Sequence, residues 1–491
     1  MNPALFLDGY KLDHRSQYPK GTNLVFSNMT ARASRISDVK KTVFFGLQYF
    51  LKKYLIEEWN HGFFTRPKDE ILTEYKRIVD NYLGPNAITF DHIADLHTLG
   101  YLPLEVKALP EGSLVDLRVP TLVLYNTHPD FFWITNYLET ILSCVTWMAS
   151  TSATTAHEYK KILTVYAKET SSIPEFVQWQ AHDFSERGMS ALEPACISGA
   201  AHLLSFTGSD TVPAIQWLEQ YYKADCTKEL IAGSVSATEH ATMCAGTKEN
   251  ELDTYRRLIN EIYPKGILSI VSDTWNYWDV LTGHLRQLKS DIMKRDGKLV
   301  IRPDSGTPEL VICGNPEATI GSPEYKGSIE LLWEVFGGKI NEKGYKELDP
   351  HIGLIYGDSI TLERCKKICE GLKAKGFAST NVVLGIGSYT YTYVTRDTFG
   401  FAIKATYCEV NGKPRNIYKS PVGDSIKKSA KGLLAVYQKT DQVKDGFFLE
   451  EEASWYNVEN CELKTVFKNG KLTNEQTLSQ IRQRLIECSP N

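Results

Sequence analysis

Several features that mark common protein classes are missing from this chain of 491 residues. Its 55 basic residues are balanced by 59 acidic ones, and a net charge of −4 argues against a protein that coats nucleic acid. No uninterrupted apolar run reaches the ~20 residues that a membrane-spanning helix needs. The first eight residues carry no basic stretch, so we expect no secretory signal peptide. The chain is therefore predicted to be cytoplasmic, with neither nucleic acid nor membrane as a partner.

Motifs for metal and nucleotide binding are missing too. None of the ten cysteines forms a CxxC pair, which predicts no zinc site and mostly buried thiols in a reducing compartment. The chain has no P-loop and no GxGxxG after a first strand, so a P-loop ATPase and a Rossmann dehydrogenase are disfavoured. His157 has no second histidine at the spacing of a zinc protease.

The middle of the chain repeats one pattern, a short apolar run that ends abruptly in small or charged residues and is followed by a helical pattern. Strands are expected at 176–181, 202–206, 266–271, 298–301, 352–356 and 381–384, with helices at 213–222, 249–263, 329–335 and 362–372. This alternation is typical of buried parallel strands in a β/α architecture. The carboxyl ends of such strands gather on one face, which makes the polar residues there candidates for one shared site. Turn formation or helix capping is the alternative for each of them taken singly.

Both ends of the chain have a β-rich pattern instead. Strands are expected at 24–29, 102–109, 121–126 and 402–410, helices at 43–59, 131–147 and 474–488, and a hairpin at 465–472. We therefore predict an α/β protein with an irregular parallel α/β barrel over residues 151–399. A second, α+β domain is predicted from residues 1–150 together with 400–491.

The sequence KLVIRPDSGTP at 298–308 is the strongest candidate for a binding loop. Arg302 offers a planar guanidinium that suits phosphate oxygens, and Asp304 can bind ribose hydroxyls or support magnesium. A plain ion pair between these two side chains explains the pattern equally well. Gly357-Asp358 and Gly387-Ser388 are weaker candidates, because glycine lets backbone amides approach a phosphate but most such sequences are turns.

His240 directly follows Glu239 in the sequence. A histidine beside a carboxylate can act as a base, a metal ligand or a phosphate acceptor, although a structural role is more common. We interpret His182 as mainly structural.

A series of motifs along nearly the whole chain resembles the nicotinate and nicotinamide phosphoribosyltransferase family. In order, these are YKLDHRSQYP, TVFFGLQYFL, AHDFSERG, FTGSDT, ATEHAT, SIVSDTW, VIRPDSGTP, YGDSI, VTRD and TVFKNGK. The resemblance is weakest across 288–296 and 313–348. It implies a type II phosphoribosyltransferase-like barrel and an enzyme of NAD salvage, a pentosyltransferase. The implied reaction converts nicotinamide and phosphoribosyl pyrophosphate into nicotinamide mononucleotide and pyrophosphate.

The same resemblance implies roles for individual residues. His240 matches a phosphate-accepting histidine, oriented by Glu239 or Asp273, through which ATP acts as co-substrate and activator. Phe184 and the partner subunit's Tyr10 would stack on the two faces of nicotinamide. Residues implied around the phosphoribosyl and pyrophosphate groups are Arg187, Ser269, Arg302, Asp304, Gly357, Asp358, Gly387, Ser388, Arg396, Lys419 and Lys427. Magnesium would be held mainly by substrate phosphates, and the protein would be a homodimer with active sites at the subunit interface.

Asp210 is expected to select the substrate. It would accept a hydrogen bond from the carboxamide and repel the carboxylate of nicotinate. Helix capping near residue 213 is an alternative or additional role. The loop at 385–389 departs from the glycine-rich family pattern, and the lysines at 419, 427 and 428 fit a solvated loop almost as well as a phosphate site.

Three other functions remain open at this point. The first is nicotinate phosphoribosyltransferase, from the same family. The second is a phosphate-binding barrel aldolase or isomerase, which would need a lysine or an acid/base pair at the strand ends. The third is a non-catalytic scaffold, which would need none of His240, Arg302, Asp304 and Asp210.

Overall fold

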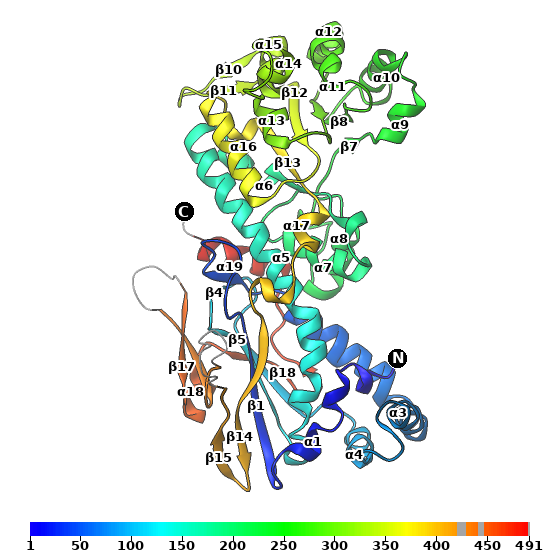
Figure 1. Cartoon of the computed structure of the whole chain (residues 1–491), viewed down its shortest axis with the longest axis vertical. Coiled ribbons are helices and arrows are strands. Elements are labelled where there is room, and N and C mark those ends of the chain that lie inside the picture. The colour runs from blue at the N-terminus through cyan, green and yellow to red at the C-terminus, as the bar shows by residue number, and fades with distance from the viewer. Residues whose placement is uncertain (420–428, 440–445, 490–491) are drawn as a thin grey trace. The chain divides into compact units, whose positions relative to one another are not determined.

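The computed structural model describes residues 1–419, 429–439 and 446–489. The chain divides into two compact units (Figure 1). Unit 1 consists of Met1–Thr154, Trp217–Asp225 and Val394–Asn491, and unit 2 consists of Thr155–Gln216 and Cys226–Tyr393. Each unit is built around its own sheet.

Unit 2 is built on a parallel sheet with the strand order β6-β13-β12-β9-β8-β7. The strands are β6 (Ala181–Asp183), β7 (Ser236–Ala237), β8 (Leu268–Val271), β9 (Leu299–Arg302), β12 (Ile352–Tyr356) and β13 (Val382–Ile386). Isolated parallel bridges join Asp183 to Ser209 and Gly208 to Gly233, and so carry the pairing on beyond β6. β8 and β12 are buried along their whole length, as expected for parallel strands covered on both faces. The predicted irregular parallel α/β barrel is confirmed.

Helices alternate with these strands in unit 2. They are α6 (Val177–Gln180), α7 (Leu192–His202), α9 (His240–Ala245), α10 (Glu251–Arg257), α11 (Tyr277–Asp279), α12 (Leu285–Lys294), α13 (Pro308–Cys313), α14 (Pro323–Lys326), α15 (Ser328–Phe336), α16 (Leu362–Ala374) and α17 (Ser388–Thr392). A small antiparallel pair, β10 (Gly338–Ile340) and β11 (Lys346–Leu348), precedes β12.

Two predicted strands of this region are wrong. Residues 176–180 form helical turns that begin at Pro174 and bury Val177 and Gln180 at helical spacing, and β6 starts only at Ala181. Residues 202–206 are the C-terminal end of α7 and the turn after it, and this helix is buried from Ala195 to His202. A short apolar run has the same sequence appearance in a buried helix as in a buried strand, which explains both errors.

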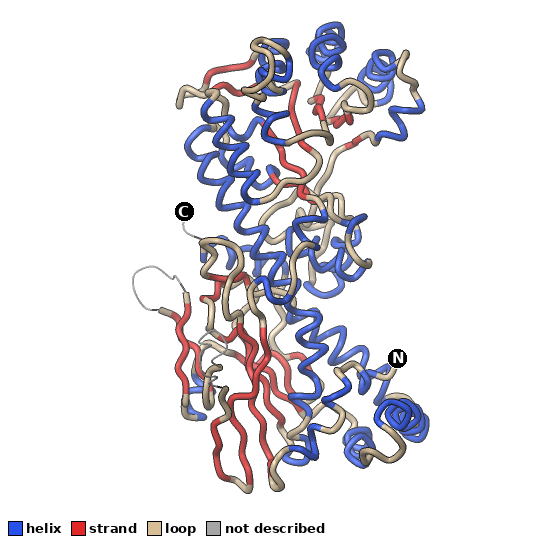
Figure 2. The backbone as a smooth tube through the Cα atoms, viewed as in Figure 1, coloured by secondary structure: helices blue, strands red, loops and turns tan. Residues whose placement is uncertain are grey.

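Unit 1 is built on an antiparallel sheet with the strand order β15-β14-β1-β5-β3-β18-β19. Its strands are β1 (Thr22–Thr30), β3 (Leu104–Ala108), β5 (Pro120–Asn126), β14 (Ala402–Val410), β15 (Lys413–Asn416), β18 (Lys464–Lys468) and β19 (Lys471–Leu472). β1 pairs with β14 on one side and β5 on the other, and β18 pairs with β3 (Figure 2). The predicted pairing of both chain ends in one sheet is confirmed.

Other elements of unit 1 flank this sheet. The helices are α1 (His14–Gln17), α2 (Leu47–Phe50), α3 (Lys68–Leu83), α4 (Asp91–Leu99), the first part of α5 (Ile134–Thr170), the end of α8 (Pro213–Tyr222), α18 (Trp455–Asn460) and α19 (Leu478–Cys488). Two short pairs join β2 (Lys41–Val43) to β4 (Leu114–Asp116) and β16 (Leu434–Gln438) to β17 (Phe447–Glu451). None of the helices described is long and apolar enough to cross a membrane.

Glu347 on β11 anchors the segment that follows α5 through hydrogen bonds. It accepts hydrogen bonds from the Ser172 backbone at 2.7 Å, the Ser172 hydroxyl at 2.8 Å and the Asn341 amide at 2.9 Å. Burial favours a raised pKa, but the hydrogen bonds from Asn341 and Ser172 outweigh it and lower the pKa of Glu347 from 4.5 to about 2. Ionised Glu347 therefore stabilises the fold fully above pH 4.5, and its contribution is lost as the pH falls toward 2.

Substitution of Glu347 by glutamine is expected to lower the free energy of unfolding by about 3 kcal/mol at neutral pH. Urea unfolding of both proteins at several pH values measures the difference. The difference should shrink as the pH falls below 4.5, because the wild-type carboxyl then also becomes protonated. A difference that stays constant down to low pH would contradict the assigned role of the ionised carboxylate.

Candidate functional site

The carboxyl ends of the parallel strands in unit 2 form one polar edge. Residues at or just after these ends are Phe184, Glu239, His240, Asp273, Arg302, Asp304, Gly357, Asp358, Gly387 and Ser388. Hydrogen bonds and close approaches connect neighbouring strand ends along this edge. The sheet thus brings together residues separated by up to two hundred positions.

His240 and Asp273 form a hydrogen-bonded pair at this edge. The His240 Nε2 atom lies 3.1 Å from Asp273 Oδ1, and the Asp304 backbone N–H donates to Asp273 Oδ2 at 2.9 Å. Burial acts to raise the pKa of Asp273, but hydrogen bonds from Ser305, Asp304 and His240 outweigh it and lower the pKa. Asp273 is therefore ionised, and its Oδ1 accepts a hydrogen bond from the Nε2–H group of the His240 ring.

Glu239 is the N-cap residue of α9. Its backbone N–H donates to the Thr242 hydroxyl at 3.3 Å, and that hydroxyl donates to the Glu239 carbonyl at 2.9 Å. Glu239 and Asp273 are both predicted to orient His240. In the structure, His240 hydrogen-bonds to Asp273.

Arg302 and Asp304 face each other without a hydrogen bond. Arg302 Nε lies 3.9 Å from Asp304 Oδ1, and neither buried atom has a hydrogen-bond partner within the described residues. The guanidinium is anchored instead by a 2.6 Å bond from Nη2 to the Thr238 carbonyl. Burial, together with repulsion from Asp273 and Asp358, raises the pKa of Asp304 despite the attraction of Arg302. The two side chains thus form a long ion pair, as the alternative interpretation expects, but no hydrogen bond joins them, which leaves both groups able to bind a ligand.

Three glycines allow the loops at this edge to approach one another closely. A Cβ atom on Gly357 would lie 1.8 Å from Asp304 Oδ1, and one on Gly387 would lie 2.9 Å from Asp358 Oδ1. A Cβ on Gly188 would lie 2.1 Å from the Ser388 hydroxyl. Arg187, in the same short turn as Gly188, is therefore placed beside the Ser388 loop.

Asp210 is held by partners on two sides. His182 Nε2 lies 2.8 Å from Asp210 Oδ1, and the Ser234 hydroxyl donates to the same oxygen at 2.6 Å. Burial acts to raise the pKa of Asp210, but these hydrogen bonds and the charge of Arg302 lower it. The Asp210 backbone N–H donates to the Asp183 carbonyl at 2.9 Å, which fixes this loop to the end of β6.

Phe184 contacts His182, the same residue that hydrogen-bonds Asp210. Its ring centroid is 4.6 Å from that of His182, and its backbone N–H donates to the Ile386 carbonyl at 2.9 Å. A Cβ on Gly385 would lie 2.8 Å from the Phe184 ring, so the glycine leaves space for the aromatic side chain. A flat aromatic face and a hydrogen-bond acceptor are thus presented together.

Comparison with known proteins assigns the chain to a family. A model described as the nicotinate phosphoribosyltransferase (NAPRTase) family matches residues 179–471, and one described as the nicotinamide phosphoribosyltransferase N-terminal domain matches residues 2–106. The chain belongs to the nicotinate phosphoribosyltransferase family. It is therefore an enzyme, a pentosyltransferase.

Similar proteins cover nearly the whole chain. A nicotinamide phosphoribosyltransferase of Acinetobacter baylyi is 52% identical over 99% of this chain and 97% of its own length. One of Mycoplasma pneumoniae is 35% identical over 88% of this chain and 96% of its own length. The crystal structure of human nicotinic acid phosphoribosyltransferase shares the fold with a TM-score of 0.58 at 16% identity, covering 99% of this chain and 93% of the human one. The nicotinate-nucleotide pyrophosphorylase of Pyrococcus furiosus also has a TM-score of 0.58, at 14% identity and with coverage of 99% and 95%.

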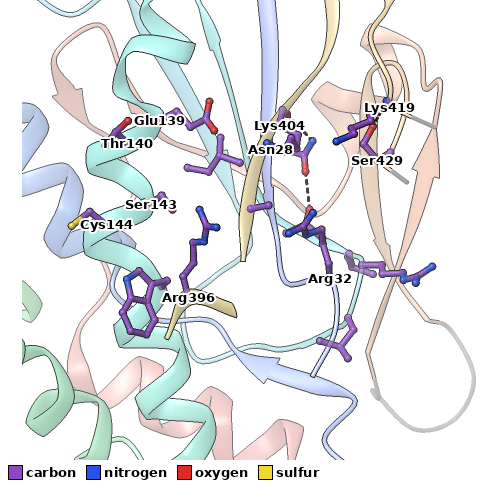
Figure 3. A pocket seen from close by; sticks show the side chains of 18 of the residues that line it. Asn28, Arg32, Glu139, Thr140, Ser143, Cys144, Arg396, Lys404, Lys419 and Ser429 are labelled. Carbon is purple, nitrogen blue, oxygen red and sulfur yellow. Dashed lines mark hydrogen bonds between the residues drawn. The ribbon is translucent and has the colours of Figure 1, made fainter. Parts of the chain in front are cut away.

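Three further residues implied by the family resemblance line a pocket in unit 1. Tyr10, Arg396 and Lys419 lie around this cavity of about 880 Å³. Figure 3 shows that Arg32 and Lys404 also line it, opposite α5 residues such as Glu139. Arg118 is a further lining residue. The pocket is rich in cationic side chains, which suits an anionic ligand.

Several candidate residues carry no sequence signal. Arg32 and Lys404 stand in ordinary strand-end and strand sequences, and Ser234 lies outside the quoted motifs. Thr238 belongs to ATEHAT, but nothing in that motif indicates that its carbonyl holds Arg302. Their positions depend on strand pairing, which one sequence does not display. Ser269, by contrast, was predicted, and its buried hydroxyl has no hydrogen-bond partner in the described part of the chain. Lys427 and the neighbouring lysine at 428 lie outside the described residues.

Substitution of Gly357 by alanine is expected to lower kcat/KM for phosphoribosyl transfer roughly a hundredfold. The new Cβ would lie 1.8 Å from Asp304 Oδ1, so the carboxylate must move by an ångström or more. Gly353→Ala in β12, the strand that precedes Gly357, is the matched control, because its Cβ would lie 3.2 Å from the flexible Lys298 side chain and 3.5 Å, an ordinary contact, from Val300. Steady-state rates of both variants test this expectation, and equal losses would remove the specific role of Gly357.

Proposed function

We propose that this protein is a nicotinamide phosphoribosyltransferase of NAD salvage, which makes nicotinamide mononucleotide and pyrophosphate from nicotinamide and phosphoribosyl pyrophosphate. The observation that carries the proposal is that the ionised Asp210 and the Phe184 ring both contact His182. An aromatic face suits the pyridine ring, and a carboxylate accepts an N–H that a carboxamide has and a carboxylate substrate does not. The names of the relatives support the same substrate.

Glycosyl transfer needs charge stabilisation and alignment more than a strong base. The centre on the ribose becomes oxocarbenium-like as pyrophosphate leaves, and fixed charges aimed at it lower the barrier. We assign the ribose hydroxyls to Asp304 and the phosphate oxygens to Arg302, whose side chains lack hydrogen bonds to each other. The close backbone turns at Gly357 and Gly387 would receive the remaining phosphate oxygens.

Magnesium fits this edge as a partner of substrate phosphates. No cluster of three or more side chains poised to hold a metal occurs in the described ranges. Asp273 and Asp358 both act to raise the pKa of Asp304, which shows that negative charge is concentrated there. These carboxylates would support a magnesium ion bound mainly by pyrophosphate, and the ion would neutralise charge on the leaving group.

ATP is proposed to act through His240. The unprotonated ring nitrogen attacks the γ-phosphorus, an N–P bond forms, the bond to the bridging oxygen breaks and ADP leaves. Asp273 holds the ring proton on the other nitrogen during this step. The added charge on His240 would then strengthen the binding of magnesium and phosphoribosyl pyrophosphate before the phosphohistidine is hydrolysed.

We further propose a homodimer in which the cationic pocket of unit 1 completes the partner's site. Tyr10 is 65% exposed, although an aromatic residue usually lies buried, and it lines this pocket with Arg396 and Lys419. The partner subunit's Tyr10 would cover the second face of the ring bound at Phe184. The cations of the same pocket would meet substrate phosphates.

One assay tests the activity directly. Purified protein with magnesium and phosphoribosyl pyrophosphate is offered nicotinamide or nicotinate, with and without ATP. We expect nicotinamide mononucleotide to form, faster with ATP. Preferred use of nicotinate would favour nicotinate phosphoribosyltransferase, the alternative, and no product from either base would favour a non-catalytic scaffold. We propose a cytoplasmic location, which fractionation of cells would test.

Mixed dimers test the interface site. Tyr10→Ala and Phe184→Ala homodimers should each be nearly inactive, because every site has lost one stacking face. A heterodimer of the two variants, purified through two different tags, should recover about half of the wild-type rate, since one of its two sites is unmodified. A heterodimer as inactive as its parents would mean that each site is built from a single subunit.

A further inference from the structure

His182 contacts both groups proposed to recognise the substrate ring. Its imidazole lies 4.6 Å from the Phe184 ring between centroids and hydrogen-bonds Asp210 at 2.8 Å. Its side chain is only 11% exposed, whereas that of Asp210 is 43% exposed. His182 therefore lies behind the carboxylate, and Asp210 faces outward.

The hydrogen bonds to Asp210 are unequal between its two oxygens. His182 Nε2 and the Ser234 hydroxyl both bind Oδ1, at 2.8 and 2.6 Å. Within the described residues no hydrogen bond reaches Oδ2. Two donors on one oxygen fix the rotation of the carboxylate and leave the second oxygen as the acceptor for a ligand.

Packing fixes the imidazole itself. A Cβ atom on Gly208 would lie 2.8 Å from His182 Nδ1, so the absence of a side chain there lets the ring lie close against the backbone. The Phe184 ring contacts the imidazole as well. Because Asp210 is ionised, Nε2 must carry the proton, and the tautomer is thereby set.

We propose that His182 is the positioning residue that sets the preference for a carboxamide over a carboxylate, by locking Asp210 with Oδ2 directed at the ligand. This inference rests on the proposed function and deepens it. A carboxamide N–H then finds an acceptor of fixed direction, while a carboxylate ligand meets the negatively charged Oδ2. Without the hydrogen bond from His182, the Asp210 carboxylate can rotate away from either ligand. Both the attraction of the carboxamide and the repulsion of the carboxylate then weaken.

The test is the ratio of kcat/KM for nicotinamide to kcat/KM for nicotinate. His182→Phe keeps a flat ring beside Phe184 but removes the donor, and the ratio should fall about tenfold to a hundredfold. The loss should appear mainly in KM for nicotinamide. His182→Gln, which offers an N–H at a similar reach, should restore much of the ratio.

Ser234→Ala provides a second, independent variant, because it removes the other donor to Oδ1 from an exposed position. Its ratio should fall in the same direction as that of His182→Phe. Thr207→Ala, in the loop after α7 and next to Gly208, is the matched control and should leave the ratio unchanged. Thermal unfolding shows whether each variant folds.

The outcomes distinguish failure of the role of His182 from failure of the proposed function. Equal losses for both substrates, or an unchanged ratio in His182→Phe and Ser234→Ala, would overturn the role of His182 and leave the enzyme's activity standing. Failure of the wild type to use nicotinamide would instead overturn the proposed function.

Discussion

Asp210→Ser is expected to abolish the discrimination between nicotinamide and nicotinate. Two like charges ~4 Å apart at an effective dielectric constant of about 20 repel by roughly 4 kcal/mol. Since each ~1.4 kcal/mol corresponds to a factor of ten, the ratio of kcat/KM values should change about a thousandfold. The ionised state of Asp210, held by hydrogen bonds and the charge of Arg302, makes this repulsion present at neutral pH.

Rates with both bases measure this change. Nicotinamide use should weaken because serine is a poorer acceptor, and nicotinate use should rise because the charge is gone. Asp210→Asn is the matched control of equal size: it should remove the repulsion while keeping the shape of the side chain. A serine variant with the wild-type ratio would exclude Asp210 from substrate selection.

His240→Ala is expected to remove the stimulation by ATP entirely, so that rates with and without ATP become equal. The alanine side chain has no nucleophile, and no phosphoryl group can be carried beside the pyrophosphate site. Asp273→Asn should reduce the stimulation as well, because an amide cannot hold the ring in the required tautomer as a carboxylate does. The measurement is the steady-state rate together with transfer of label from γ-labelled ATP to the protein.

Another histidine–aspartate pair in unit 2, away from the candidate site, provides the control. His351 Nδ1 lies 2.7 Å from Asp349 Oδ1, but the pair precedes β12 and so lies at the amino end of the sheet. His351→Ala should keep both the ATP stimulation and the labelling. Stimulation that persists in His240→Ala would show that ATP acts at another group.

The barrel could be predicted because its buried strands leave a strong local signal. The apolar runs before Asp273, Arg302, Gly357 and Gly387 are strands in the structure, and their ends meet at one edge. The runs at 176–180 and 202–206 are also apolar but form helical turns, because burial on all sides removes the periodicity that separates a helix from a strand.

The arrangement of side chains at the edge was harder to predict. Glu239 is adjacent to His240 in sequence, yet the ring hydrogen-bonds to Asp273, thirty-three residues away, whose carboxylate accepts the bond. Ser234 reaches Asp210 across a similar separation. Such pairs depend on which strands are neighbours and on the register between them, and a single sequence specifies neither.

The pairing of β1 with β14 has a consequence for synthesis of the chain. β1 is an inner strand of its sheet, but its neighbour on one side spans residues 402–410 and is translated near the end. All strands of the parallel sheet lie between these two segments, so that sheet can form on the ribosome while β1 still exposes unpaired backbone groups. A product truncated before residue 402 would keep this open edge, and we expect it to aggregate rather than remain dispersed.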